Sequence, residues 1–225
     1  MVKAVLLDIE GTTTSLAFVK EVLFPYAHRC LPAFLAQHHA EPAVAEQLQQ
    51  VRQIAGQDLT VEDIGAVLRT WIAQDLKIAP LKNLQAMLWQ RGYKSGAIKG
   101  HVYSDAVIAM KKWQRAGRSL YVYSSGSVQA QKLLFKHSGH GDLTSLFSGH
   151  FDLKTGGKKD AASYAEIARA VGLPPREIVF LSDAEDELDA ARRAGMRTVW
   201  VVREGRLPAP GGHITARAFD SIKLS

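Results

Sequence analysis

Three short apolar runs in this chain each end in a polar residue, and this repeated layout constrains the fold more than any other feature. Branched apolar residues bounded by turn signals predict buried strands. From Asp105 onward such strands alternate with helical patterns, which is typical of an α/β fold with a parallel sheet covered on both faces. Ligands of such sheets lie at the carboxyl ends of the strands. The runs and the residues that follow them are Ala4–Leu7 with Asp8, Ser119–Tyr123 with Ser124, and Ile178–Leu181 with Ser182 and Asp183.

The remaining elements after Asp105 follow from apolar spacing and from glycine and proline positions. Asp160 is a suitable N-cap for one of the helices. No strand is expected beyond Val202. We expect helices over 105–117, 128–136, from 161 to Gly172 and from about 185 to Gly195, strands over 150–153 and 198–202, and a loop containing Pro208, Pro210, Gly211 and Gly212.

The region between the first strand and Asp105 has a different pattern. From about Phe18 to Gly100 the apolar residues recur at helical spacing, and no strand alternation is visible. Thr60 with Asp63 resembles a capping box before one helix, and another helix over Leu81–Trp89 is expected to end by Gly92. We therefore expect residues 1–15 and 101–225 to form the core and residues 16–100 to form a helical insertion.

Composition limits the possible partners. The chain of 225 residues has a net charge of +6, but it contains no run of five or six basic residues and no interleaved aromatic and basic residues. Anionic small molecules are therefore favoured over nucleic acid. Cys30 is the one cysteine, so no internal disulfide can form, which favours a reducing compartment such as the cytoplasm. The sequence contains no apolar run of 18 residues, so we expect no membrane partner. We also expect a monomer.

The residues that follow the strands carry a recognisable chemistry. Carboxylates at Asp8, Glu10 and Asp183 would repel one another and require a cation, and an oxygen-only ligand set favours Mg²⁺. The turn at Ser124 and Ser125 precedes a helix and offers hydroxyl and N–H donors to a phosphate. Lys158 could neutralise the transferring phosphoryl group. One carboxylate could attack phosphorus and another could exchange protons with the leaving oxygen and with water.

The segments that carry these residues resemble the four motifs of the haloacid dehalogenase superfamily of phosphatases. The first motif is usually D-x-D-G-T, and here it is Asp8-Ile9-Glu10-Gly11-Thr12. The glutamate is a departure that the enolase-phosphatases of methionine salvage share. The resemblance implies a Rossmann-like core with an inserted helical cap. The matching stretches are LLDIEGTTTSLAFVKEVLFPY, WQRGYKSGAIKGHVYSD, YSSGSVQAQKLLF, GGKKDAASY and FLSDAEDELDAA.

The resemblance also implies a role for each candidate residue. Asp8 would be the nucleophile and a Mg²⁺ ligand, and Glu10 would be the acid/base and bind the metal, through its main-chain carbonyl in one alternative. Asp183 would complete the metal site, and Glu187 is a candidate for contact with the metal through water. The substrate phosphate would bind Ser124, Ser125 and Lys158. The family usually has a threonine where Leu153 stands, so Lys154 and Lys159 are alternatives to Lys158.

The reaction implied is a two-step conversion of a phosphorylated diketone. The substrate, 2,3-diketo-5-methylthiopentyl 1-phosphate, would be enolised and then dephosphorylated to an acireductone. Glu10 and residues of the helical insertion are candidates for the base of the first step, and the insertion would act as a lid. Two alternatives are a phosphatase of the same superfamily that acts on another small phosphomonoester and a basic module that binds nucleic acid.

Overall fold

The computed structural model describes residues 1–56, 58–207 and 211–224, which form two compact units. The first unit, called the core unit below, contains residues 1–16 and 99–225, and the second, called the helical unit, contains residues 17–98. The helices and strands of both are β1 (Ala4–Leu7), α1 (Leu16–Phe18), η1 (Val19–Leu23), α2 (Phe24–His38), α3 (Pro42–Ala55), α4 (Val61–Ala73), α5 (Ala79–Lys94), α6 (Ser104–Arg115), β2 (Ser119–Tyr123), α7 (Val128–Lys136), η2 (Thr144–Leu146), β3 (Phe147–Phe151), α8 (Ala161–Val171), η3 (Pro175–Glu177), β4 (Ile178–Ser182), α9 (Glu185–Arg193), β5 (Arg197–Val201), β6 (Ile214–Ala216) and η4 (Phe219–Ser221).

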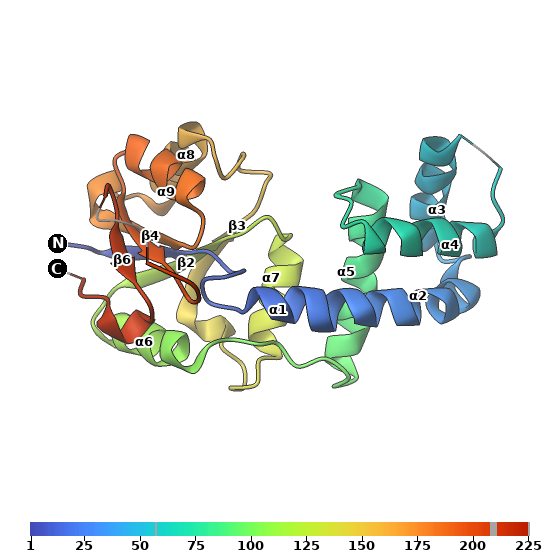
Figure 1. The fold of residues 1–225 in the computed structure, drawn as a ribbon, viewed down its shortest axis with the longest axis horizontal. Coiled ribbons are helices and arrows are strands. Elements are labelled where there is room, and N and C mark those ends of the chain that lie inside the picture. Colours follow the sequence, from blue (N-terminus) through green and yellow to red (C-terminus); the bar gives the residue numbers. More distant parts are fainter. Residues whose placement is uncertain (57, 208–210, 225) are drawn as a thin grey trace. The chain divides into compact units, whose positions relative to one another are not determined.

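The core unit is built on a six-stranded parallel sheet in the order β3-β2-β1-β4-β5-β6. The helices α6 and α7 cover one face of this sheet, and α8 and α9 cover the other (Figure 1). The strands β1 and β4 are buried along their whole length, and their residues are apolar except Ser182, which ends β4. The order reverses beside β1, since the chain runs from β1 to β2 and β3 and then returns to β4. The predicted α/β fold with a Rossmann-like parallel sheet is confirmed.

Several element boundaries differ from the sequence-based predictions. The strand expected over 150–153 is β3 at Phe147–Phe151, because pairing with β2 continues through the weakly apolar residues before His150. The strand β6 was not expected, because its three residues carry too short a pattern to predict a strand and are placed by pairing with β5. Of the expected loop near the C-terminus, Pro208 and Pro210 lie outside the described residues.

The helical unit has its own apolar interior, built from one face each of α2, α3, α4 and α5. The predicted capping box is present, since Thr60 Oγ1 accepts a hydrogen bond from the Asp63 N–H and the Asp63 carboxylate accepts one from the Thr60 N–H. The helix expected to end by Gly92 instead continues to Lys94. At Gly92 this helix packs so closely on Ile98 and Tyr26 that a Cβ would collide with them, which explains the glycine. Within the described residues, no helix is long and apolar enough to cross a membrane.

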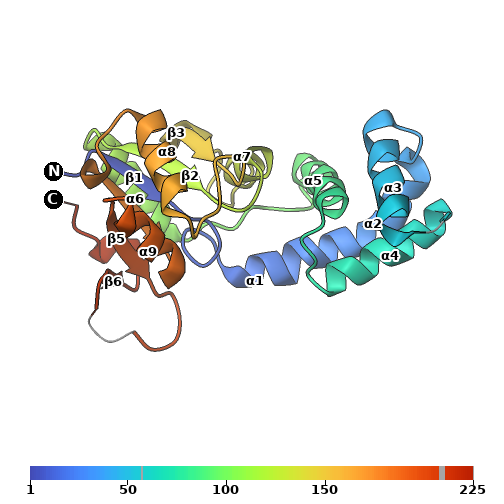
Figure 2. The ribbon, with the colours of Figure 1, turned by 90° about the horizontal axis from the view of Figure 1, so that it is seen from above.

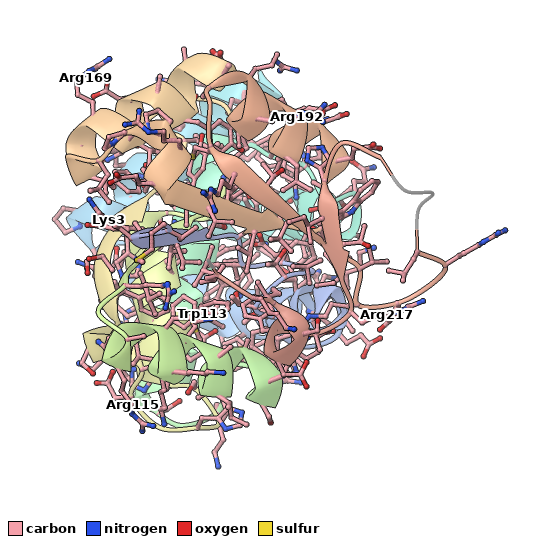
Figure 3. All side chains as sticks on the ribbon, turned by 90° about the vertical axis from the view of Figure 1, so that its left-hand side faces the viewer. Lys3, Trp113, Arg115, Arg169, Arg192 and Arg217 are labelled. Atoms are coloured by element: carbon pink, nitrogen blue, oxygen red, sulfur yellow. The ribbon has the colours of Figure 1, made fainter. Side chains whose placement is uncertain are left out.

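Many side chains on the outside of the core unit are charged, whereas several beneath its helices are apolar. Figure 3 shows this near the C-terminal ends of α6 and α8, where Arg115 and Arg169 point away from the unit, while Trp113 of α6 points inward. Trp113 is buried and stacks on Phe219 with ring centroids 5.6 Å apart. The basic residues labelled in the figure project from separate elements.

Candidate functional site

The loop after β1 is held in one conformation by the residues that the sequence places directly after Asp8. The Thr13 hydroxyl donates to the Asp8 carbonyl at 3.0 Å, and the Gly11 and Thr14 N–H groups bond within the loop at 2.8 and 2.9 Å. Thr12, Thr13 and Thr14 are all buried. Gly11 has φ +74°, and a Cβ there would collide with the Asp183 carboxylate, so glycine is required. The close approach of Gly11 to Asp183 therefore places the loop after β1 beside the residue that follows β4.

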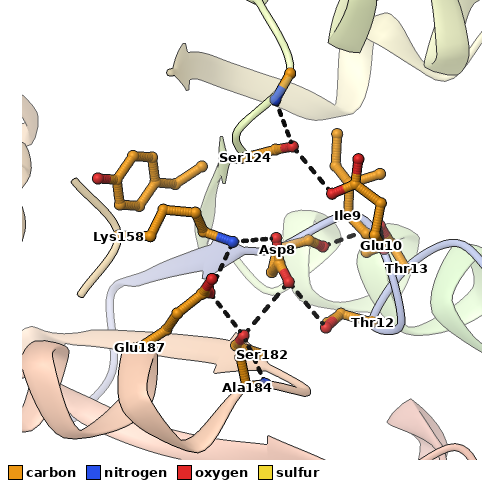
Figure 4. Close-up of polar contacts among 12 residues, drawn as sticks. Asp8, Ile9, Glu10, Thr12, Thr13, Ser124, Lys158, Ser182, Ala184 and Glu187 are labelled. Atoms are coloured by element: carbon orange, nitrogen blue, oxygen red, sulfur yellow. Dashed lines mark hydrogen bonds and ion pairs between the residues drawn. The ribbon is translucent and has the colours of Figure 1, made fainter. Parts of the chain in front are cut away.

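The Asp8 carboxylate lies at the carboxyl end of β1, buried to 3% exposure, and has three side-chain partners (Figure 4). Lys158 Nζ is 2.5 Å from Oδ1, and the Ser182 and Thr12 hydroxyls lie 3.3 and 3.5 Å from Oδ2. Lys158 Nζ is also 2.7 Å from Glu187 Oε2. Since a buried charge is stable only when it is paired, the lysine and the two carboxylates stabilise one another.

The electrostatics of this group follow from burial and from mutual repulsion. Burial first, and then the Asp8 and Glu187 carboxylates, raise the pKa of Asp183 to about 7. Burial and Asp8 likewise raise the pKa of Glu187. Burial alone would lower the pKa of Lys158, but the Asp8 and Glu187 carboxylates outweigh it and hold that pKa above its ordinary value. Lys158 is therefore a permanent cation among carboxylates that repel one another.

The turn after β2 reaches the same region through Ser124. Its hydroxyl donates to Glu10 Oε2 at 3.3 Å and accepts from the Gly126 N–H at 3.1 Å. Burial, followed by the Asp8 charge, raises the pKa of Glu10. Ser125 is the exposed neighbour of Ser124 in this turn, and Ser127 caps α7, its hydroxyl accepting from the Ala130 N–H. Such a turn at a helix start presents N–H and hydroxyl donors suited to a phosphate.

The other two lysines considered from the sequence are placed differently. Lys154 and Lys159 are exposed, and Lys159 pairs with Asp186 on the surface at 2.7 Å. Among the three, Lys158 is the one with a contact to Asp8.

The donor set of this site fits a magnesium ion. Asp183 lies beside Gly11, and the Asp8 carboxylate is near enough to raise the pKa of Asp183 by repulsion. A bound cation would relieve this repulsion between the two carboxylates. Among the described residues, no three His, Cys, Asp or Glu side chains are arranged to hold a metal. Mg²⁺ commonly takes one or two carboxylates and completes its coordination with water and substrate phosphate. Two carboxylates with a main-chain carbonyl are therefore a suitable set.

The sequence did not indicate two residues whose hydrogen bonds support this site, Arg203 and Ser182. The Arg203 guanidinium donates two hydrogen bonds to the Thr12 carbonyl, at 3.0 and 2.8 Å, and pairs with Asp105 at 2.7 Å. It also lies 4.1 Å from the centre of the Tyr103 ring. Arg203 is 191 positions from Thr12, and no local pattern could have indicated this contact. Ser182 was seen only as the end of a strand, and its hydroxyl links Asp8 with Glu187.

Comparisons with known proteins show the family of this chain. A family model described as haloacid dehalogenase-like hydrolase matches residues 2–195. The protein named "Enolase-phosphatase E1" of Pseudomonas aeruginosa (strain LESB58) is 55% identical over 222 residues, which cover 98% of each chain. The protein of the same name from Azotobacter vinelandii is 53% identical over 99% of this chain and 97% of its own.

Solved structures give the same result. The structure of the UTR4 protein of Saccharomyces cerevisiae has a TM-score of 0.83 at 36% identity and covers 99% of this chain and 100% of its own. The L-2-haloacid dehalogenase of Xanthobacter autotrophicus, at 18% identity and a TM-score of 0.59, covers 97% of this chain and 96% of its own and shows likeness of fold alone. The resemblance seen in the sequence is thereby confirmed: this chain belongs to the haloacid dehalogenase-like hydrolases, and among them to the enolase-phosphatase E1 family.

Proposed function

We propose that this protein converts 2,3-diketo-5-methylthiopentyl 1-phosphate into an acireductone and inorganic phosphate, by enolisation followed by dephosphorylation, in methionine salvage. The observation that carries this proposal is the buried pair of Asp8 and Lys158, 2.5 Å apart at the carboxyl end of β1, in a chain 55% identical to an enolase-phosphatase over almost its whole length. A carboxylate held against a buried cation suits attack on a phosphoryl group whose negative charge the cation offsets.

Phosphoryl transfer begins with the substrate phosphate bound between the turn after β2 and Lys158. Ser124 and Ser125 supply hydroxyl and N–H donors, and Lys158 supplies positive charge. An Asp8 carboxylate oxygen then forms a bond to phosphorus as the bond from phosphorus to the enol oxygen breaks. The product of this step is an aspartyl phosphate on Asp8.

Glu10 exchanges the protons of both steps. Its raised pKa allows it to carry a proton, which it gives to the departing enol oxygen. As a carboxylate it then removes a proton from the water that attacks phosphorus, which restores Asp8 and releases phosphate. Glu10 is also the candidate in the core unit for the base of the enolisation step.

A magnesium ion would be held by the Asp8 and Asp183 carboxylates and by Glu10, whose main-chain carbonyl is the donor in our assignment. When bound, it supplies positive charge that offsets the phosphate and polarises the neighbouring oxygen atoms. Glu187 would remain the partner of Lys158.

The helical unit, residues 17–98, would act as the lid of the site. Lids of this kind exclude water during the reaction and contact the part of the substrate that does not react. In this substrate that part is the methylthio end.

The test is incubation of the purified protein with the diketone phosphate and Mg²⁺, following phosphate release and the ultraviolet absorbance of the enol together. Both signals should rise, with the enol signal preceding or accompanying phosphate. Phosphate release from other small phosphomonoesters at a higher kcat/KM would instead support a phosphatase of different specificity. EDTA should abolish phosphate release, and added Mg²⁺ should restore it.

A further inference from the structure

The segment that carries Lys158 is fixed in an unusual way. Three successive carbonyl oxygens, those of residues 156, 157 and 158, each accept a hydrogen bond from a side-chain hydroxyl. All three hydroxyl-bearing residues are buried, with exposures of 0–2%. The pairs are Tyr123 with the Gly156 carbonyl at 2.9 Å, Ser163 with the Gly157 carbonyl at 2.8 Å, and Tyr164 with the Lys158 carbonyl at 2.7 Å.

Close packing shows that this segment has little freedom to move. Gly156 has φ +143°, a conformation that residues with a Cβ rarely adopt, and a Cβ there would collide with Ser163 Oγ. Ser163 and Tyr164 lie in the first turn of α8, which Asp160 caps through a hydrogen bond from the Ala162 N–H. The hydroxyl donors therefore stand on a rigid helix and on the end of β2.

One of these tyrosines also lies against the lysine side chain, and the other packs on the ring of the first. The Tyr123 ring centre is 5.9 Å from Lys158 Nζ, and the Tyr123 and Tyr164 rings pack edge to face with centroids 5.5 Å apart. A lysine side chain has many rotamers in solution. Here the fixed main chain and the aromatic wall direct Nζ to a place 2.5 Å from Asp8 and 2.7 Å from Glu187.

Tyr123 also joins this segment to the turn that we assign to phosphate binding. It is the last residue of β2 and directly precedes Ser124, whose hydroxyl contacts Glu10. One strand end therefore presents successive residues to the two sides of the site, Tyr123 to the lysine segment and Ser124 to Glu10.

We propose that Tyr123, Ser163 and Tyr164 are positioning residues for Lys158, which fix the main chain of residues 156–158 so that Nζ meets the transferring phosphoryl group. This inference rests on the proposed function, since it assumes that Lys158 acts on phosphate. Their hydroxyls bond the main chain of residues 156–158, and in our proposal they act through the lysine and not on the substrate. Misplacement of a catalytic group by about 1 Å can cost about 10²-fold in rate, so the loss of one of three hydroxyls should have a smaller effect.

The first test compares Tyr164→Phe with Tyr121→Phe. The first substitution removes the hydroxyl that bonds the Lys158 carbonyl and keeps the ring, and the second makes the same chemical change two residues before Tyr123 on the same strand. Tyr164→Phe should lower kcat by roughly tenfold and raise KM by a smaller factor, because the lysine meets the phosphate in the bound substrate and acts most strongly in the transition state. Tyr121→Phe should leave both constants unchanged. Equal kcat in Tyr164→Phe and the wild type would overturn the proposal.

The second test asks whether Tyr164 acts through Lys158. Binding of inorganic phosphate in the presence of Mg²⁺ is measured by titration calorimetry for the wild type, Tyr164→Phe, Lys158→Ala and the double variant. Tyr164→Phe should weaken binding in the wild type and have no effect once Lys158 has been replaced, because its role is then lost. Equal weakening in both backgrounds would indicate a general structural effect and overturn the proposal. If Tyr164→Phe fails to fold, Tyr123→Phe takes its place in the same cycle.

The failure of this inference can be distinguished from the failure of the proposed function. A wild-type protein that neither binds phosphate nor releases it from the diketone phosphate would refute both. A fully active wild type whose Tyr164→Phe variant loses the same factor with and without Lys158 would refute the positioning role alone.

Discussion

The two units of this chain bury different kinds of side chain. Among the described residues, the buried polar side chains of the helical unit are Gln47 and Gln85, and Gln47 accepts a hydrogen bond from Asn83 at 2.9 Å. The rest of its interior is apolar. The core unit, in contrast, buries a larger set of polar side chains, several of them at the carboxyl ends of β1, β2 and β4. The buried polar residues of the core unit are Asp8, Thr12, Thr13, Thr14, Ser124, Gln131, Ser138, Lys158, Ser163, Ser182 and Thr198.

We interpret this difference as a separation between side chains that are buried for stability and side chains that, in the proposed function, are buried for chemistry. A buried polar group costs free energy unless it is paired, whereas a buried apolar group stabilises the fold directly. The polar cluster of the core unit is paired around Asp8 and Lys158. Substitutions in this cluster should therefore change catalysis more than stability, and substitutions in the helical interior should do the reverse.

The largest effect is expected for Asp8→Asn. An amide is a poor nucleophile and a weaker metal ligand, so phosphate release should fall by several orders of magnitude. The side chain keeps its size, and the thermal midpoint should stay close to that of the wild type. Asp186→Asn, an exposed substitution of the same kind on α9, should retain activity. Near-native phosphate release by Asp8→Asn would contradict the assignment of the nucleophile.

Lys158→Ala should have the next largest effect. Removal of one group that stabilises transition-state charge typically costs about 10²–10³-fold in kcat. Lys154→Ala and Lys159→Ala change exposed side chains and should stay near wild-type activity. All three are compared by steady-state kinetics of phosphate release. A greater loss at either neighbour would move the role to that residue.

Leu68→Ala tests the helical unit. Leu68 is fully buried among apolar side chains, so its truncation should lower the free energy of unfolding by about 2–5 kcal/mol. Phosphate release per folded molecule should remain close to that of the wild type. Denaturant unfolding and kinetics on the same sample provide the comparison, with the exposed Ile54→Ala as control. A loss of kcat without loss of stability would abolish the contrast between the units.

Thr60→Ala should have the smallest effect. It removes the hydroxyl that caps α4, and loss of such a cap costs about 1 kcal/mol. Thr70→Ala, an exposed change inside the same helix, should not destabilise the protein. Chemical denaturation measures both. If Thr60→Ala were as stable as the wild type, the capping box would contribute nothing in this context.

The sequence predicted most of the core unit because its elements are short and strongly patterned. The apolar runs of β1 and β2 end at the residues expected, and Asp8 and Ser124 follow them. Parallel strands must then bring these residues to one edge of the sheet. The weakly patterned β3 and β6 depend on pairing with neighbouring strands, so their limits could not be read from the chain.

The supporting contacts of the site could not be predicted for a different reason. The apolar spacing of Tyr164, Ile167 and Ala168 predicts that Tyr164 lies on the buried face of its helix, and the structure places it there, fully buried. The spacing gave no sign that the hydroxyl would reach the Lys158 carbonyl. The bonds from Arg203 to the Thr12 carbonyl join residues at opposite ends of the chain. Such contacts are set by tertiary packing, which no local pattern records.

The central claim is that Asp8 carries the phosphoryl group during the reaction, and a rapid-quench experiment tests it most directly. Substrate labelled in its phosphate is mixed with the wild type and with Glu10→Gln, quenched in acid, and the labelled peptide is identified. Glu10→Gln should slow water attack by about 10²–10⁴-fold, more than it slows the first step, because an enolate leaves more readily than an ordinary alkoxide. Label should therefore accumulate on Asp8 in Glu10→Gln, with only a small transient amount in the wild type. Phosphate release without label on Asp8 in either protein would contradict the account.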